Sequence, residues 1–198
     1  YVWIDADRNG RQDEPASAGR NGVAATLLDC ADQPVAVDAF GDPVEGQLTA
    51  DDGDGAPGYY RFTNLVPGCY RVRFSGLPDG FTPTLPDVGD DAADSDGLTT
   101  AARSVAADEA DLSHDLGLFA PVSVGDQVWF DADHDGIQEL CPAEPASPPP
   151  GCERPLSGVG VTLIDASGAE VTVDAFGQPV PPVQIGGDGL YRFDDLLP

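Results

Sequence analysis

The sequence predicts an all-β protein made of two tandem Ig-like Greek-key β-sandwiches, the second of them truncated. Three observations support this fold class. The apolar stretches are short, rich in β-branched and aromatic residues, and bounded by Gly, Pro, Asp or Asn. No segment keeps the apolar spacing of an amphipathic helix. The chain also repeats itself, so one set of strands accounts for both halves.

The repeat begins with an apolar strand that runs directly into an acidic loop. Residues 1–13 (YVWIDADRNGRQD) return as residues 127–139 (QVWFDADHDGIQE). Further matched pairs follow in the same order, at 21–29 and 157–165, 37–44 and 173–180, and 58–67 and 189–198. The offset between the copies changes from 126 to 136 to 131, so the copies differ by insertions and deletions between shared strands.

This repeat predicts one domain over residues 1–120 and a second over residues 121–198. The segment Val122–Asp126 has no counterpart at the start of the first copy, and the second copy ends where the first continues for more than fifty residues. We therefore expect an interior piece of a longer protein, with two domains of roughly a hundred residues. The short linker Ala120–Pro121 predicts an extended, end-to-end arrangement of the two domains.

Individual strands follow from their side-chain patterns. In Cys69–Phe74, aromatic and aliphatic residues alternate with arginine, which is the period of a half-buried strand. Residues 23–28 and 159–164 are apolar runs that predict more fully buried strands. The segment Tyr59–Phe62 leads through the turn residues 64–68 toward Cys69, which predicts a hairpin. Further strands are expected at residues 81–84, 98–105 and 112–119.

The charge of the chain excludes several classes of partner. Nine basic residues, all of them arginine, stand against 35 acidic residues, which gives a net charge of −26. Such a surface repels nucleic-acid backbones and anionic membranes, so neither is an expected partner. No apolar run has the length of a membrane span, so no membrane insertion is expected in this segment. The same charge suits divalent cations, although solubility or a salty habitat would also explain it.

Four cysteines are arranged in a way that favours disulfides. Cys141 and Cys152 bracket a proline-rich segment that cannot form a regular element, while Cys30 ends one predicted strand and Cys69 begins another. We predict the pairs Cys141–Cys152 and Cys30–Cys69, which implies an oxidising, extracellular compartment. Reduced, buried cysteines are the alternative.

The repeated acidic loop predicts a calcium site in each copy. Its pattern, D-x-D-x-[ND]-G-x-x-[DE], has the oxygen spacing of the first nine positions of an EF-hand loop. At position twelve, where an EF-hand has a bidentate glutamate, the copies have Ala16 and Pro142; Glu14 and Glu153 could compensate. The predicted ligands are Asp5, Asp7, Asn9, the Arg11 carbonyl and Asp13 in the first copy, and Asp131, Asp133, Asp135, the Ile137 carbonyl and Glu139 in the second.

A third acidic segment, Asp87–Gly97, carries four closely spaced aspartates whose mutual repulsion favours a bound cation. These predicted calcium ligands are Asp90, Asp91, Asp94 and Asp96. The loop Asp51–Gly55 is also acidic but less ordered in pattern, and we interpret it as a solvated hairpin tip.

Four motifs in this order resemble a known family: V-W-x-D-x-[DN]-x-[DN]-G-x-Q-[DE], G-V-x-[VA]-T-L, Y-x-F-x-[ND]-L-x-P-G-x-Y-x-V and V-G-D-D-x-A-D-S-D-G. They are similar to the calcium-binding B-type repeats of serine-aspartate repeat surface adhesins, relatives of the collagen-adhesin B-type fold. The resemblance implies a Greek-key sandwich, several Ca2+ ions per repeat and extracellular display. In the family pattern an acid lies six residues before the Val of the G-V strand; Glu153 fits that position and is added to the predicted ligands, whereas the first copy has Ser17 there. The isopeptide bond of related domains cannot form here, because there is no lysine.

We therefore predict a calcium-stiffened structural repeat of an extracellular surface adhesin, stalk or filament, at the cell surface or secreted, with neighbouring repeats of the same protein as partners. The alternative is a module that binds a host or surface protein or a glycan, with Trp3 and Trp129 as a sugar-stacking platform. Exposure of those rings would discriminate the two. No enzyme is predicted, because Ser113, His114 and Asp115 are neighbours along a strand and not a convergent triad.

Overall fold

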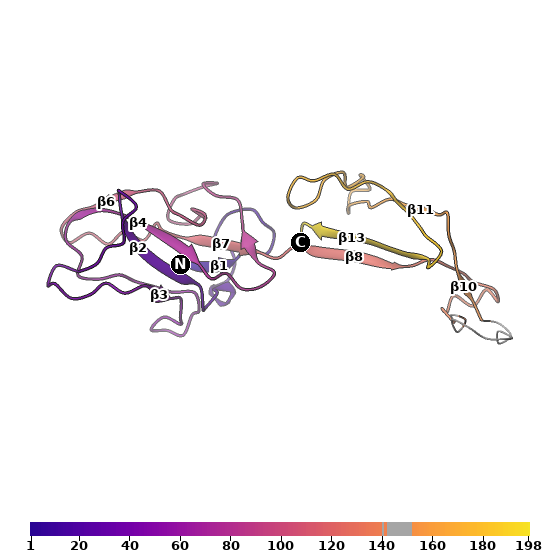
Figure 1. Cartoon of the computed structure of the whole chain (residues 1–198), viewed down its shortest axis with the longest axis horizontal. Coiled ribbons are helices and arrows are strands. Elements are labelled where there is room, and N and C mark those ends of the chain that lie inside the picture. Colours follow the sequence, from indigo (N-terminus) through magenta and orange to yellow (C-terminus); the bar gives the residue numbers. More distant parts are fainter. Residues whose placement is uncertain (140, 142–151) are drawn as a thin grey trace. The chain divides into compact units, whose positions relative to one another are not determined.

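The computed structural model describes residues 1–139, 141 and 152–198 of the chain. The chain forms two compact units, Tyr1–Ala120 (unit 1) and Pro121–Leu197 (unit 2), and each is described by itself. The described residues contain strands and one short 3-10 turn, Ala16–Ala18, and no α-helix (Figure 1). Among the described residues, no helix is long and apolar enough to cross a membrane. The all-β prediction is confirmed.

Unit 1 consists of two facing sheets. One sheet has the strand order β3-β2-β4-β6 and the other the order β1-β7-β5, in which β1 runs parallel to β7. The strands are β1 Val2–Ile4, β2 Ala24–Asp29, β3 Gln47–Leu48, β4 Gly68–Ser75, β5 Thr82–Pro83, β6 Arg103–Val105 and β7 Leu116–Phe119.

Both sheets of unit 1 contribute to one core. Ala25 and Leu27 of β2 meet Val72 and Phe74 of β4 and, from the other sheet, residues such as Leu118 of β7. The alternation along β4 explains its part in this core, because its apolar side chains point inward while its arginines point outward. Two sheets that share an apolar layer form the sandwich that the sequence predicts.

Unit 2 is built from three strand pairs. β8 pairs with β13, β9 with β10, and β11 with β12, all antiparallel. The strands are β8 Val122–Gln127, β9 Trp129–Phe130, β10 Arg154–Pro155, β11 Gly160–Val161, β12 Val183–Gln184 and β13 Leu190–Leu196.

The two units repeat the same hydrogen bonds as well as the same sequence. Val2 N donates to Gly58 O at 2.9 Å, and Val128 N donates to Gly189 O at 2.8 Å. β2 pairs with β3 and β11 with β12 in the same register, since Ala24 lies opposite Leu48 and Gly160 opposite Gln184. The insertions and deletions therefore lie in the loops between shared strands.

The hairpin predicted between Tyr59–Phe62 and the Cys69 strand is wrong. Tyr59 forms its β-bridge with Ala50, while β4 pairs with β2 and β6. The turn chemistry is present, with Asn64 in a left-handed conformation, but the turn does not join two paired strands. The Tyr60 ring packs edge-on against Phe74 of β4, with ring centroids 5.5 Å apart.

Both predicted disulfides are formed. Cys30 bonds to Cys69 with their Cα atoms 5.6 Å apart, and Cys141 bonds to Cys152 with a Cα separation of 4.8 Å. The first ties the end of β2 to β4, and the second closes the loop that follows the second acidic motif.

Replacing Cys30 and Cys69 by serine is expected to destabilise unit 1 by about 3 to 4 kcal/mol. The bond closes a loop with a sequence separation of 39 residues, so its loss returns considerable chain entropy to the unfolded state. Denaturant unfolding of the double variant beside the oxidised chain measures the change. Equal midpoints for the two would contradict this account of the bond.

Candidate metal centres

The first acidic loop is organised around Asp5, which directly follows β1 and is fully buried. Its Oδ1 accepts the Asn9 amide at 3.1 Å, and its Oδ2 accepts the Gly10 amide at 2.7 Å and the Thr84 hydroxyl at 2.6 Å. Gly10 has a φ of 79°, which lets the loop turn back over the carboxylate. The loop is thus wrapped around one carboxylate by local hydrogen bonds.

Asp7 and Glu14 complete a cluster with Asp5. One carboxylate oxygen from each lies within 4.8 Å of the others. Glu14 Oε1 accepts the Ala6 amide at 2.7 Å, whereas its Oε2 is buried and has no hydrogen-bond partner. Calcium binds oxygens at about 2.3 to 2.6 Å, so oxygens on opposite sides of one ion lie about 5 Å apart. The spacing of the three oxygens and the unpartnered Oε2 therefore fit a calcium ion.

The other predicted ligands of the first loop are tied to this cluster by hydrogen bonds. Asn9 Nδ2 donates to Asp7 Oδ2 and to Asp13 Oδ2, both at 3.2 Å, and Asn9 Oδ1 accepts the Arg11 amide at 2.7 Å. The backbone on either side of Arg11 is also bonded, since Gln12 N donates to Ala93 O and Ser95 N donates to Gly10 O. Ligation by Asn9, Arg11 and Asp13 stays a prediction.

The second acidic loop has the same construction. Asp131 Oδ2 accepts the Gly136 amide at 3.1 Å, and Asp135 Oδ1 accepts the Ile137 amide at 2.7 Å, as Asn9 does with Arg11. Oxygens of Asp131, Asp133 and Asp135 lie within 4.8 Å of one another. The negative charges of Asp135 and Asp133 raise the pKa of the Glu139 carboxyl, so this loop concentrates charge that a cation would neutralise.

Glu153 takes in the second copy the place that Glu14 takes in the first. It is 1% exposed, and its Oε1 accepts the Ala132 amide at 3.0 Å, the counterpart of the bond from Ala6 to Glu14. Its Oε2 accepts the Glu139 amide at 3.2 Å. The adjacent Cys141–Cys152 bond and a β-type pair of hydrogen bonds between Glu153 and residues 139 and 141 hold it there.

The third acidic segment does not bring its four predicted ligands into one group. Asp91 pairs with Arg103, whereas Asp94 is buried and its Oδ2 accepts the Gly89 amide at 2.6 Å. Asp96 Oδ2 accepts the Asp115 amide at 2.7 Å. Asp90 is exposed, and its backbone carbonyl accepts the Ala93 amide. Calcium binding by this segment stays a prediction.

A buried acid outside the motifs lies beside Asp96. Asp115 is buried, and its Oδ2 has no hydrogen-bond partner. Burial is the main cause that raises the pKa of Asp96 to about 7 and that of Asp115 to about 6. The negative charge of Asp115 contributes to the raised pKa of Asp96, and those of Asp94 and Asp91 contribute to that of Asp115. No spacing rule in the sequence pointed to Asp115, because it lies 19 residues from Asp96 and its place depends on the packing of β7.

The structure also places the residues named for a sugar-binding platform and for a catalytic triad. Trp3 is 1% exposed, so it belongs to the core and is not a stacking platform, and Trp129 is half-buried. The Ser113 hydroxyl donates to Asp111 Oδ1 at 2.6 Å, while His114 Nδ1 lies 2.7 Å from Thr100 Oγ1. The Ser113 hydroxyl is therefore directed at a carboxylate and not at the His114 ring.

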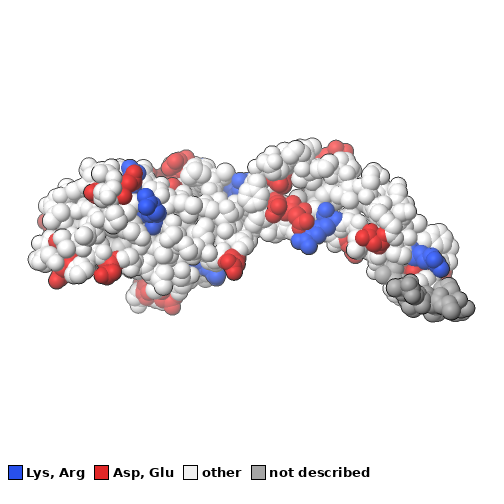
Figure 2. Space-filling model, in the orientation of Figure 1, with Lys and Arg blue, Asp and Glu red and all other residues white. Residues whose placement is uncertain are grey.

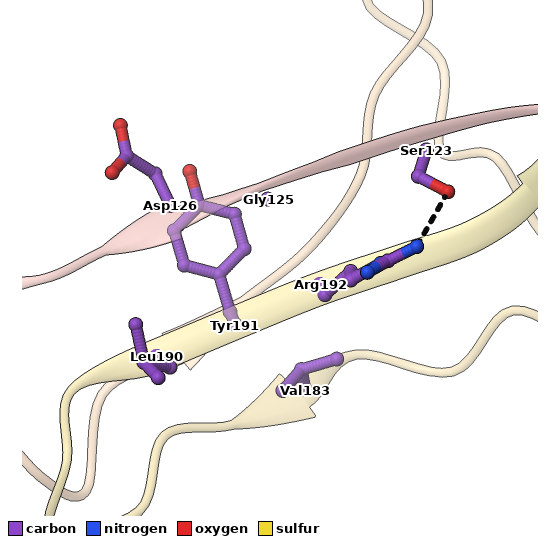
Figure 3. A pocket seen from close by; sticks show the side chains of 7 residues that line it. All are labelled: Ser123, Gly125, Asp126, Val183, Leu190, Tyr191 and Arg192. Carbon is purple, nitrogen blue, oxygen red and sulfur yellow. Dashed lines mark hydrogen bonds between the residues drawn. The ribbon is translucent and has the colours of Figure 1, made fainter.

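One pocket of about 570 Å³ lies along β8 and β13 of unit 2 (Figure 3). It is lined by Val183 of β12, by Leu190, Tyr191 and Arg192 of β13, and by Ser123, Gly125 and Asp126 of β8. In unit 1, Gln47, the counterpart of Val183, bonds to the backbone of Arg61. The pocket in unit 2 holds no cluster of predicted ligands.

Acidic side chains are spread over the face of each unit that Figure 2 shows, without a continuous basic patch. The expectation that nucleic acid is not a partner stays a prediction.

Comparison with known proteins identifies relatives of the chain. The SdrD B-like domain model matches residues 1–118. Serine-aspartate repeat-containing protein C of Staphylococcus aureus strain Newman is 32% identical over 197 residues, which cover 99% of this chain and 17% of the relative; the protein from strain N315 matches to the same extent. A streptococcal ancillary pilin aligns with a TM-score of 0.36 and 18% identity over 99% of this chain and 49% of the pilin chain, a likeness too low to assign a function. The chain belongs to the SdrD B-like domain family.

Proposed function

We propose that the chain is a calcium-stiffened structural repeat of an extracellular adhesin, stalk or filament. One observation carries the proposal. In both copies a glutamate from outside the acidic loop accepts the amide that follows the first aspartate, with Ala6 bonded to Glu14 and Ala132 to Glu153. The number of residues between the acidic loop and the glutamate differs between the copies, yet the carboxylate accepts the equivalent amide in both. A cation bound at the same place in each copy would account for this.

Calcium bound there would connect parts of the fold that are distant in sequence. In unit 1, Asp5 lies at the end of β1 and is held by Thr84, while the backbone of Gly10–Gln12 is bonded to Ala93–Ser95. An ion held by Asp5, Asp7 and Glu14 would tie these segments together and offset the repulsion of neighbouring carboxylates. In unit 2 the ion would be held by Asp131, Asp133 and Asp135, with Glu139 and Glu153 beside them.

Family membership settles two broader points. The relatives are serine-aspartate repeat proteins, so the prediction that the chain is not an enzyme is confirmed. The extracellular localisation predicted from the cysteines is confirmed by the same membership and agrees with the two disulfides. The chain spans only 17% of the length of its first relative, so the partners of the whole protein are proposals. We propose neighbouring repeats of the same protein as the first partners, with a host protein or glycan as the second class.

Stretching the chain from its two ends is expected to require a higher unfolding force in calcium than in a chelator. The ion would bridge strand ends that otherwise separate under load. Single-molecule force spectroscopy on the full chain measures this, with the Asp5→Asn and Asp131→Asn double variant as the calcium-insensitive control. Equal forces in the two buffers would reject stiffening, even if calcium binds.

A further inference from the structure

One peptide bond of unit 1 carries both groups that an internal cleavage needs. Asp42 precedes Pro43, and this is the only Asp–Pro pair in the sequence. An aspartate carboxylate can attack the carbonyl carbon of its own residue. A proline nitrogen leaves more readily than an ordinary amide nitrogen, because it is more basic. The nucleophile and the leaving group are therefore adjacent at this bond.

The bond lies in a hairpin turn that presents it to solvent. Asp42 and Pro43 are both exposed, and Val37 bridges Pro43 across the hairpin. The Asp38 amide donates to the Asp42 carbonyl oxygen at 2.8 Å. This hydrogen bond polarises the carbonyl and would stabilise the negative charge that its oxygen gains during the attack. The Asp38 carboxylate accepts the Asp42 amide at 3.0 Å, and Glu45 lines the same shallow hollow as Pro43, so both of these titratable neighbours are acidic.

Unit 2 contains the same hairpin without the attacking carboxylate. The Asp174 amide donates to Gln178 O at 2.8 Å, and Val173 bridges Pro179 as Val37 does Pro43. Residues 173–180 differ from residues 37–44 only in having Gln178 for Asp42. An uncharged amide oxygen is a much weaker nucleophile than a carboxylate. The two copies therefore differ at this turn in the one group that the cleavage requires.

We propose that Asp42–Pro43 is a self-cleavage site. The Asp42 carboxylate attacks its own main-chain carbonyl carbon, the Pro43 nitrogen takes up a proton and leaves, and the C–N bond breaks to give a cyclic anhydride at Asp42. Water then opens the anhydride, so one water is consumed, with Asp42 as a new carboxyl end and Pro43 as a new amino end. Mild acid favours the step, because the leaving nitrogen must be protonated while the attacking carboxyl is still partly ionised.

The Cys30–Cys69 disulfide spans the cut. Cys30 lies before the bond and Cys69 after it, so the two fragments stay covalently joined. β2 and β4 also lie on opposite sides of the cut and pair along the whole of β2. A cut chain therefore keeps its sandwich and carries tension through the disulfide until the disulfide is reduced.

Incubation of the oxidised full chain in mild acid tests the proposal, at the lowest pH at which tryptophan fluorescence still reports a folded core. Mass spectrometry is expected to show a gain of one water, and electrophoresis should separate fragments 1–42 and 43–198 only after reduction. Asp42→Gln, which copies the turn of unit 2, should stay intact. Gln178→Asp should create a second cut, whose fragment separates without reduction because the Cys141–Cys152 bond does not span it.

A peptide of residues 36–45 tests the part played by the hairpin. It keeps the Asp–Pro bond but does not hold the turn on its own. The folded chain should therefore be cut about fivefold faster, which is the effect of one hydrogen bond to the reacting carbonyl. An intact folded chain, cleavage of Asp42→Gln at the same bond, resistance of a folded Gln178→Asp variant, or equal rates for chain and peptide would each overturn the proposal. None of these outcomes depends on calcium binding.

Discussion

Chelation of calcium is expected to lower the melting temperature of the chain by on the order of 10 °C. A ligand present at a hundred times its dissociation constant stabilises the folded state by about 2.7 kcal/mol per site, and domains of this size shift by roughly 4 °C per kcal/mol. Without the ion, the carboxylates of Asp5, Asp7 and Glu14 remain close together with no counter-charge between them. Their repulsion favours opening of the loop.

Calorimetry in excess calcium and in EDTA measures this shift. Asp5→Asn should remove most of the calcium dependence of unit 1, because Asp5 is both buried and part of the cluster. Asp79→Asn, an exposed aspartate outside every cluster, should keep the full shift. An identical melting temperature in the two buffers would contradict calcium-dependent stability.

The sequence predicts the local part of each site well because that part depends on neighbours in the chain. In the first loop, the bonds from Asn9 and Gly10 to Asp5 span four and five residues, and the D-x-D-x-N-G spacing expresses them directly. The positions of most strands and both disulfides could be predicted for a similar reason, since period-two patterns and turn residues mark where a strand starts and ends.

The remaining features depend on contacts that no local pattern records. Thr84 reaches Asp5 across 79 residues, because β5 and β1 both lie beside β7. Asp91 forms its ion pair with Arg103 of β6, which lies twelve positions later in the sequence, so the pair depends on where β6 packs. The predicted hairpin failed for the same reason, since β4 pairs with β2 and β6, which are distant in sequence, and not with the segment just before it.

Glu14→Gln and Glu153→Gln are each expected to weaken calcium binding at one loop by about tenfold or more. Glutamine can still accept the amide of Ala6 or Ala132 through its carbonyl oxygen. At position 153 it also gives up the bond from the Glu139 amide, because its NH2 group cannot accept a hydrogen bond. What it loses is one negative charge, and calcium affinity depends strongly on the number of charged ligands. A tenfold change corresponds to about 1.4 kcal/mol.

Isothermal titration of the full chain with calcium separates the two variants. Each should lose affinity at one binding event and keep the other, whereas Glu45→Gln in unit 1 and Glu170→Gln in unit 2, both exposed and outside the clusters, should titrate like the parent chain. If Glu14→Gln binds normally, the first loop is completed by other oxygens, and the predicted ligand Asp13 becomes the next candidate.

The two glutamates should also respond differently to reduction. Glu153 is adjacent in sequence to Cys152, whose bond to Cys141 holds the returning segment against the second loop, whereas Glu14 follows the first loop directly. Replacing Cys141 and Cys152 by serine should therefore weaken the second calcium site and leave the first unchanged. Loss of both sites, or of neither, would show that the disulfide does not position Glu153. A loss at the second site alone would mean that the disulfide positions the glutamate in the second copy. In the first copy the short sequence separation between Asp5 and Glu14 would have the same effect.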